Sequence, residues 1–106
     1  MRMRFMRVIV FFDLPVETKA NLRQYNKFRK YLIGQGFIMM QKSVYSKLTL
    51  NGSSSDTVVV NLRKNLPSTG LVQALIVTEK QYQNIEFMVG EGHKETIDTQ
   101  QRLVVV

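Results

Sequence analysis

Residues 6–15 read M-R-V-I-V-F-F-D-L-P, and this stretch decides the fold. Val8 to Phe12 are consecutive apolar residues, each β-branched or aromatic, which is typical of a strand buried on both faces. The run ends at Asp13, and Pro15 follows two residues later. The pattern predicts a central strand with a carboxylate at the point where the chain leaves the core.

Asp13 has more than one interpretation from local sequence. Because an unpaired carboxylate is costly to bury, Asp13 must be exposed on the following loop or held by a cation, a helix terminus or a partner chain. An equally good reading is an Asp that only breaks the strand or caps the next helix. Local sequence leaves these alternatives open.

The composition indicates one domain that spans residues 1–106. The chain has no cysteine, which excludes disulfides and thiolate metal sites and fits a reducing cytoplasm. Arg2, Arg4 and Arg7 precede an apolar run, as in a secretory signal, but Asp13 closes that run after five residues. No apolar stretch approaches the ~20 residues that span a bilayer, so we expect a cytoplasmic protein without membrane contact.

The formal net charge of +7 is unevenly distributed. Residues 1–50 carry ten Lys or Arg against two acidic residues, whereas residues 51–106 carry five against six. A cationic half in a small domain indicates binding to nucleic acid or to an acidic surface. The alternative is a solvated face that only keeps the protein soluble.

Residues 17–33 are predicted to form an amphipathic helix, with Thr18 as N-cap and Gly34 as its stop. At about 100° per residue, one side gathers the apolar residues Leu22, Tyr25, Phe28, Leu32 and Ile33. The polar side is almost purely cationic and carries Lys19, Arg23, Lys27 and Lys30. Arg29 falls on the apolar side, where it either extends its charged end to solvent or pairs across an interface.

The middle of the chain predicts two extended pieces and a second helix. Residues 37–40 and 43–50 are strand-like, with a bulge or register change in the second piece, and Asn51-Gly52 turns the chain. Residues 53–67 combine strand-forming valines with serines and an Asp suited to a helix start, and a helix is the preferred interpretation. Its core-facing residues would be Val58, Val59, Leu62 and Leu66.

Residues 71–78 read L-V-Q-A-L-I-V-T and predict another central strand. A polar connection at 79–84, a short strand at 85–89 and a turn at 90–92 would follow. Residues 102–106 are strand-like to the terminus and should pair with a sheet, their own or a neighbour's. The resulting β-α-β-β-α-β order is the ferredoxin-like α+β arrangement with an appended C-terminal strand, a fold that supports many functions.

Common catalytic signatures are missing from the sequence. The one histidine, His93, lies in a polar stretch and is interpreted as a surface residue. No phosphate-binding loop, nucleophile elbow or zinc-protease motif occurs, and residues 71–78 lack the aromatic motif of an RNA-recognition module. The remaining candidate for chemistry is Asp13, which lies in the cationic first half of the chain. Mg²⁺ is usually held by one or two carboxylates, and a two-fold dimer axis could supply two copies of Asp13.

Several segments together resemble the CRISPR-associated protein two family, in particular its members from type II systems. They are R-V-I-V-F-F-D-L-P at 7–15, F-R-K-Y-L-I-G-Q-G-F at 28–37, M-Q-K-S-V-Y-S at 40–46, T-E-K-Q-Y at 78–82 and R-L-V-V-V at 102–106. The resemblance covers nearly the whole chain. The strand ending in D-L-P, followed at this distance by G-F-x-x-x-Q-x-S-V-Y, is its most specific part.

The resemblance implies a ferredoxin-like homodimer whose terminal strand, including Leu103, Val104, Val105 and Val106, extends the partner's sheet. It implies a role in spacer acquisition, in which the dimer bridges integrase dimers and holds duplex prespacer DNA on its basic surface. Some family members are metal-dependent endonucleases on RNA or DNA, and their Mg²⁺-binding Asp maps to Asp13. The aromatic residue before that Asp maps to Phe12, which lacks a hydroxyl. The family's motif serine maps to Ser43, which either helps to position the metal or water or only pairs two strands.

Three functional hypotheses follow. The first is an architectural subunit of an integration complex, in which Lys19, Arg23, Lys27 and Lys30 contact DNA. The second is a Mg²⁺-dependent endonuclease acting on its own, with paired Asp13 residues as metal ligands. The third is a ligand-binding regulatory domain of the same fold, against which the cationic helix argues. The first is preferred, with nuclease activity retained beside it.

Overall fold

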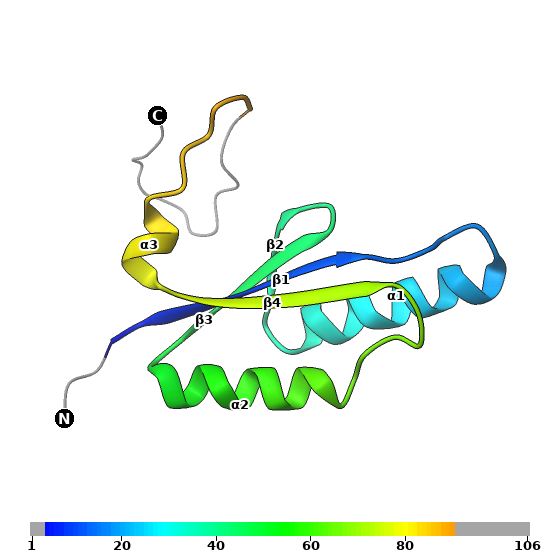
Figure 1. Cartoon of the computed structure of the whole chain (residues 1–106), viewed down its shortest axis with the longest axis horizontal. Coiled ribbons are helices and arrows are strands. Elements are labelled where there is room, and N and C mark those ends of the chain that lie inside the picture. Colours follow the sequence, from blue (N-terminus) through cyan, green and yellow to red (C-terminus); the bar gives the residue numbers. More distant parts are fainter. Residues whose placement is uncertain (1–3, 91–106) are drawn as a thin grey trace.

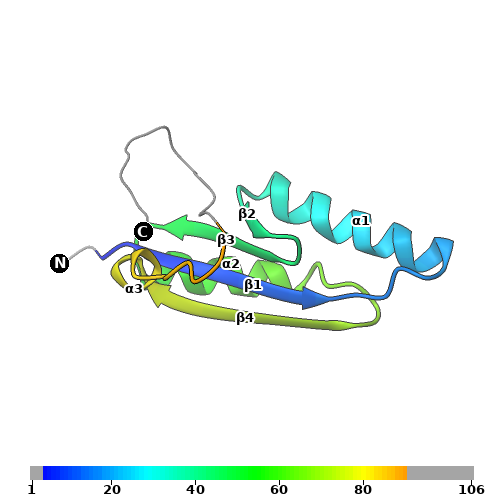
Figure 2. The same cartoon turned by 90° about the horizontal axis from the view of Figure 1, so that it is seen from above.

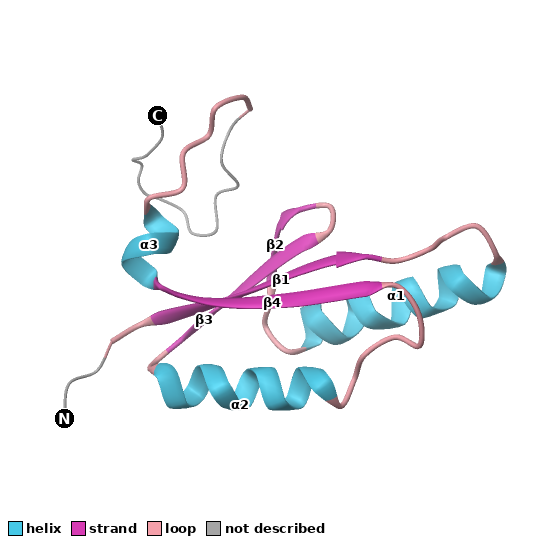
Figure 3. Ribbon diagram, viewed as in Figure 1, coloured by secondary structure: helices cyan, strands magenta, loops and turns pink. Residues whose placement is uncertain are grey.

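A four-stranded antiparallel sheet with two long helices forms the body of the protein (Figures 1 and 3). The structure, a computed structural model, describes residues 4–90. In chain order the elements are β1 (Met6–Asp13), α1 (Lys19–Gly34), β2 (Ile38–Gln41), β3 (Val44–Thr49), α2 (Gly52–Arg63), β4 (Leu71–Thr78) and α3 (Glu79–Gln83). The predicted ferredoxin-like α+β order is confirmed, with α3 as an addition.

Strand β1 is central, as its apolar run predicts. The sheet order is β2-β3-β1-β4, and β1 pairs antiparallel with β3 from Met6 to Phe11 and with β4 along its whole length (Figure 2). Successive side chains of a strand point to opposite faces. Val8, Val10 and Phe12 therefore point to one face, where all three are buried.

Both long helices cover the face that carries Val8, Val10 and Phe12. Helix α1 buries Phe28 and Leu32, and α2 buries Leu62, in one cluster with the β1 residues. Val58 and Val59 pack against this cluster, as predicted, but Leu66 is 48% exposed and lies outside it. The opposite face of the sheet, which we call the open face, has no long helix over it in the part of the chain that the structure describes.

Side-chain caps set where the two long helices begin. Thr18 caps α1, as predicted, because its hydroxyl accepts a hydrogen bond of 3.0 Å from the Asn21 amide. The cap of α2 is Asn51, whose side chain accepts from the Ser54 amide at 2.8 Å. Asn51 thus starts the helix and does not simply turn the chain. The prediction of a serine as N-cap and of Asp56 as a first-turn acid was wrong, because α2 begins one residue earlier, at Gly52.

Three predictions for the second half were also wrong. Within residues 4–90, β4 lies at the edge of the sheet and not at its centre, with Leu71 and Leu75 55% and 51% exposed. The predicted polar connection is helix α3, because Thr78 and Gln81 form a reciprocal capping box that starts a helix directly after β4. Residues 85–89 form no strand.

The predicted irregularity of the hairpin is present but lies in the other strand. The register shift falls in β2, between Met39 and Gln41, while β3 pairs regularly with β1. The predicted terminal strand at 102–106 and His93 lie outside the described residues. Within residues 4–90, no helix is long and apolar enough to cross a membrane.

Gly70 positions the end of β1 from the neighbouring strand. It adopts φ +97°, and a Cβ at this position would lie 2.6 Å from Leu14 Cδ2 and 2.9 Å from the Asp13 carbonyl oxygen. A side chain would therefore be strained by the backbone conformation and would also collide with the segment that follows Asp13. Only glycine lets β4 begin this close to the end of β1.

Replacing Gly70 by Ala should destabilise the fold by about 1–3 kcal/mol, the usual cost of a strained backbone conformation. The matched control is Gly34→Ala, because no atom lies within 4 Å of the added Cβ and the position is helical. That control should be neutral or stabilising by up to ~1 kcal/mol. Urea denaturation of both variants measures the difference, and equal stabilities would contradict the role of Gly70.

Candidate nucleic-acid interface and acidic site

Asp13 is the last residue of β1 and is exposed. Alternation along the strand places it on the open face, in register with Leu71 at the start of β4. It forms no ion pair or side-chain hydrogen bond with any other residue of the described chain. Because Thr18 caps α1, the interpretation of Asp13 as a helix cap is excluded. The carboxylate is thus available at one end of the open face.

Phe12 and Ser43 flank Asp13 but differ in their surroundings. The Phe12 ring points to the helix-covered face, where it stacks on Tyr45 at 5.7 Å and meets Phe28 edge-on at 5.3 Å. Its side chain therefore packs the core on the face away from Asp13. Ser43 is half-buried, and its carbonyl accepts the Phe12 amide at 3.0 Å. This bond holds Ser43 beside the end of β1.

Three of the four predicted DNA-contacting residues come together on α1. Arg23, Lys27 and Lys30 are exposed and line a shallow hollow of about 520 Å³ together with Asn26. Lys19 is exposed in the first turn of the same helix but lies outside the hollow. Helix α1 contains no acidic residue, so this cationic face has no carboxylate of its own helix to neutralise it. A cationic helix face of this kind attracts the phosphate groups of a nucleic acid.

Arg29 on the same helix behaves differently from its cationic neighbours. It is half-buried and forms no ion pair with another residue in the range 4–90. This agrees with an arginine that extends its charged end to solvent along an apolar side. Of the N-terminal arginines, Arg4 is exposed and Arg7 is buried.

A single chain does not offer a complete metal site in the part that the structure describes. No group of three or more His, Cys, Asp or Glu residues is close enough there to hold an ion. Asp13 alone supplies one carboxylate, which suits Mg²⁺ as a partial ligand because this ion keeps several waters and takes few protein ligands. Another copy of the chain could supply a second carboxylate through a two-fold axis.

A buried ion pair closes the other end of the open face. Arg7 is only 6% exposed, and its Nε lies 2.6 Å from Glu79 Oε1 of α3. Its guanidinium also lies 4.1 Å from the ring centroid of Tyr82, and the Tyr82 hydroxyl accepts a 3.3 Å bond from Ser46 of β3. Helix α3 is thereby fixed to two strands.

This cluster explains the T-E-K-Q-Y segment, which sequence reasoning used only as a family signature. Thr78 and Gln81 start the helix, while Glu79 and Tyr82 hold Arg7. The two sides of the ion pair are 72 residues apart, so no local spacing could have revealed it. The one signal in the sequence is an arginine inside a strand that is otherwise apolar, since such a charge needs a partner.

Comparison with known proteins places the chain among CRISPR proteins. A family model described as CRISPR associated protein Cas2 matches residues 6–85. A protein of Treponema denticola is 57% identical over 101 residues, which cover 95% of this chain and 100% of that protein. Relatives from Ligilactobacillus salivarius (44% identical, 95% and 100% covered) and Streptococcus mutans (42%, 93% and 91%) are also similar. All three are named CRISPR-associated endoribonuclease Cas2.

Arg7→Met should cost about 2–3 kcal/mol of folding free energy, because it leaves the Glu79 carboxylate partly buried without its partner. The matched control is Arg4→Met, which removes the same charge from an exposed position and should change stability by less than about 0.5 kcal/mol. Chemical denaturation measures both. If Arg4→Met and Arg7→Met were equally stable, the ion pair would not hold α3.

Proposed function

Because the chain belongs to the CRISPR-associated protein Cas2 family, we propose that it is a homodimeric, nucleic-acid-binding subunit for spacer acquisition. In this role it holds duplex prespacer DNA and bridges integrase subunits. The observation that carries the proposal is the exposed cationic face of α1, where Arg23, Lys27 and Lys30 share one hollow. Lysine and arginine side chains on one exposed helix face suit the phosphate backbone, so binding of a duplex should depend little on its base sequence.

The geometry of α1 suits a duplex. At 1.5 Å per residue, the cationic stripe from Lys19 to Lys30 is about 17 Å long. Duplex DNA carries one negative charge per ~1.7 Å of its axis, so such a stripe faces several phosphates at once. The hollow is shallow, as expected for contact with a convex backbone and not with a small ligand.

A second copy of the chain is the proposed occupant of the open face. Leu71 and Leu75 of β4 are exposed, in register with Asp13 and with the buried Ile9 of β1. A 106-residue domain gains stability when it covers such a surface, and a two-fold interface pairs the same patch of both copies. Because Asp13 ends the same face, a dimer through it would bring two carboxylates toward one axis. The terminal residues Leu103 to Val106 are proposed to add to this contact.

Endoribonuclease activity is a second candidate, and the names of the relatives together with the free carboxylate of Asp13 favour it. Two Asp13 side chains would hold Mg²⁺, which supplies Lewis-acid polarisation of a phosphoryl oxygen and a more acidic bound water. The chain's own part would be to fix these carboxylates at the end of a rigid central strand. The cationic face of α1 would hold the substrate backbone.

The double variant Arg23→Ala/Lys27→Ala tests the cationic face. Each phosphate contact contributes about 0.9 to the slope of log K against log salt concentration, so the slope for blunt duplex DNA should fall by about 1.8 for each protomer whose α1 contacts the duplex. The matched control is Lys42→Ala/Lys80→Ala, which removes the same charge from the β2–β3 turn and from α3. Filter-binding titrations at several salt concentrations measure both slopes, and an equal fall in the two variants would show only a net-charge effect.

Asp13→Asn tests the acidic site, because it keeps the size of the side chain and removes the charge that Mg²⁺ requires. Mg²⁺-dependent cleavage of single-stranded RNA should fall by at least about 100-fold, while blunt-duplex affinity and the dimer should be unchanged. Glu17→Gln, which neutralises an exposed carboxylate four residues away, is the control and should cleave normally. Normal cleavage by Asp13→Asn would rule out this metal site, and loss of duplex binding would contradict the separation of the two surfaces.

A further inference from the structure

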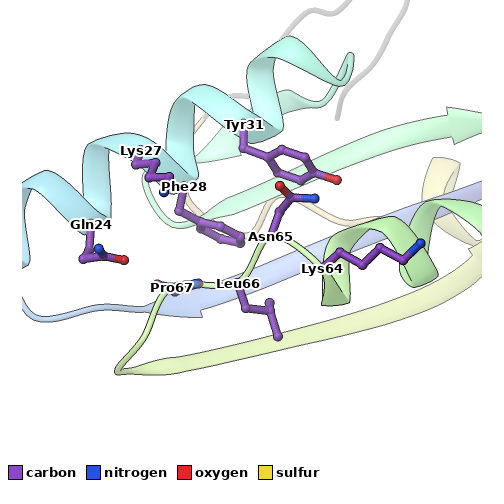
Figure 4. Close-up of a pocket in the computed structure, with 8 residues that line it drawn as sticks. All are labelled: Gln24, Lys27, Phe28, Tyr31, Lys64, Asn65, Leu66 and Pro67. Carbon is purple, nitrogen blue, oxygen red and sulfur yellow. The ribbon is translucent and has the colours of Figure 1, made fainter.

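A groove of about 140 Å³ separates α1 from the segment that joins α2 to β4 (Figure 4). Gln24, Lys27 and Tyr31 of α1 line one side, and Lys64, Asn65 and Leu66 line the other. In Figure 4 the side chains of Gln24 and Tyr31 reach from α1 toward the groove, and Asn65 reaches toward them from the opposite side. The groove is thus formed by side chains of α1 and of the connection between α2 and β4.

The middle of the groove combines an aromatic ring, an apolar side chain and amides. Tyr31 packs against the core, so its ring is held in place, and Leu66 is 48% exposed. Asn65 donates from Nδ2 to the Asn61 carbonyl at 2.9 Å, which leaves its Oδ1 as an acceptor. The Gln24 side chain makes no hydrogen bond within the described residues, so both its donor and its acceptor are available.

The two charged residues that line the groove, Lys27 and Lys64, come from its opposite sides. Figure 4 shows the Lys64 side chain extended along α2, away from Lys27, which lies beside Phe28. Both ammonium groups are on exposed residues, and no carboxylate lines the groove. Lys27 also lines the hollow of the cationic face, so the two features are continuous. An anionic chain that runs along α1 would therefore pass directly over the groove.

We propose that this groove receives one unpaired base of a nucleic-acid strand whose backbone follows α1. A planar, apolar ring with polar edges matches Tyr31 and Leu66 for stacking and Gln24 and Asn65 for hydrogen bonds. The volume is below the ~300 Å³ of a site for a whole small ligand, so a single base fits while sugar and phosphate remain outside, near the two lysines. The inference rests on the proposed function, since it adds a base contact to the same nucleic-acid surface.

The test compares two duplexes that differ only in an unpaired tail. One is blunt, and the other carries three unpaired nucleotides at each 3′ end, with 5-iodouracil in the tail for photocrosslinking. Stacking of one base on an aromatic side chain corresponds to about a tenfold gain in affinity, so the tailed duplex should bind about tenfold more tightly. The crosslink should map to Tyr31. Equal affinities, or crosslinks only outside the groove, would overturn the proposal.

Variants separate stacking from general electrostatics. Tyr31→Leu should abolish the advantage of the tail and the crosslink, whereas Tyr31→Phe should keep the advantage, because its ring still stacks. Lys64→Ala should weaken binding of the tailed duplex more than Arg63→Ala, a neighbouring exposed residue of like charge outside the groove. Thermal melting checks that each variant is folded. If Arg63→Ala and Lys64→Ala had equal effects, the groove would have no role beyond net charge.

The outcomes distinguish this inference from the proposed function. If blunt duplex binds and the tail adds no affinity, the groove proposal is contradicted and the proposed function is not. If no duplex binds, the proposed function fails, and a single-stranded oligonucleotide then tests the groove. A crosslink from this oligonucleotide to Tyr31 supports the groove proposal, and the absence of that crosslink overturns it. Concentration-dependent hydrogen-exchange protection of residues 24–31 in the free protein would assign the groove to a second copy of the chain and overturn the proposal.

Discussion

The pairing of β1 on both sides is the constraint on which the rest of the structure depends. A buried strand must satisfy all its backbone polar groups, and β1 does so through β3 and β4. Its helix-facing residues Val8, Val10 and Phe12 then form the centre of the core, against which α1 and α2 pack. Where this pairing ends, at Asp13, the chain leaves the core with a charge that no described residue neutralises.

The two faces of the sheet separate two kinds of chemistry. On the helix-covered side of the sheet, the outer surface of α1 is cationic, and α1 carries no carboxylate. The open face carries apolar side chains between two ionic ends, Asp13 at one end and the Arg7–Glu79 pair at the other. Among residues 4–90, α3 covers the Arg7 end of this face, and Asp13 at the other end is exposed. The proposed nucleic-acid surface and the proposed metal ligand therefore lie on opposite faces, where separate substitutions can test them.

The features that the sequence predicted correctly depend on residues that are close together in the chain. The apolar run of β1, the cap Thr18 and the cationic stripe of α1 were all predicted and are confirmed, because propensity, capping and helical period act within a few residues. The edge position of β4 was missed, since Leu71 and Leu75 are as apolar as residues of a central strand and their exposure is decided by sheet order.

Long-range contacts account for the other misses. The Arg7–Glu79 pair joins residues 72 apart, and the close approach of Gly70 to Asp13 joins β4 to the end of β1. The groove likewise needs residues from α1 and from the α2–β4 connection. Such pairs are set by packing, and local sequence does not identify the partners, even where, as at Arg7, a charge inside an apolar run indicates that a partner is needed.

The central claim is that α1 is the nucleic-acid surface, and lysine footprinting tests it most directly. Acetylation of each lysine, followed by mass spectrometry, would be measured with and without blunt duplex DNA. The account predicts protection of Lys19, Lys27 and Lys30, with unchanged reactivity of Lys42 in the β2–β3 turn and Lys80 in α3. Protection of Lys42 and Lys80 while the three α1 lysines stay reactive would contradict it.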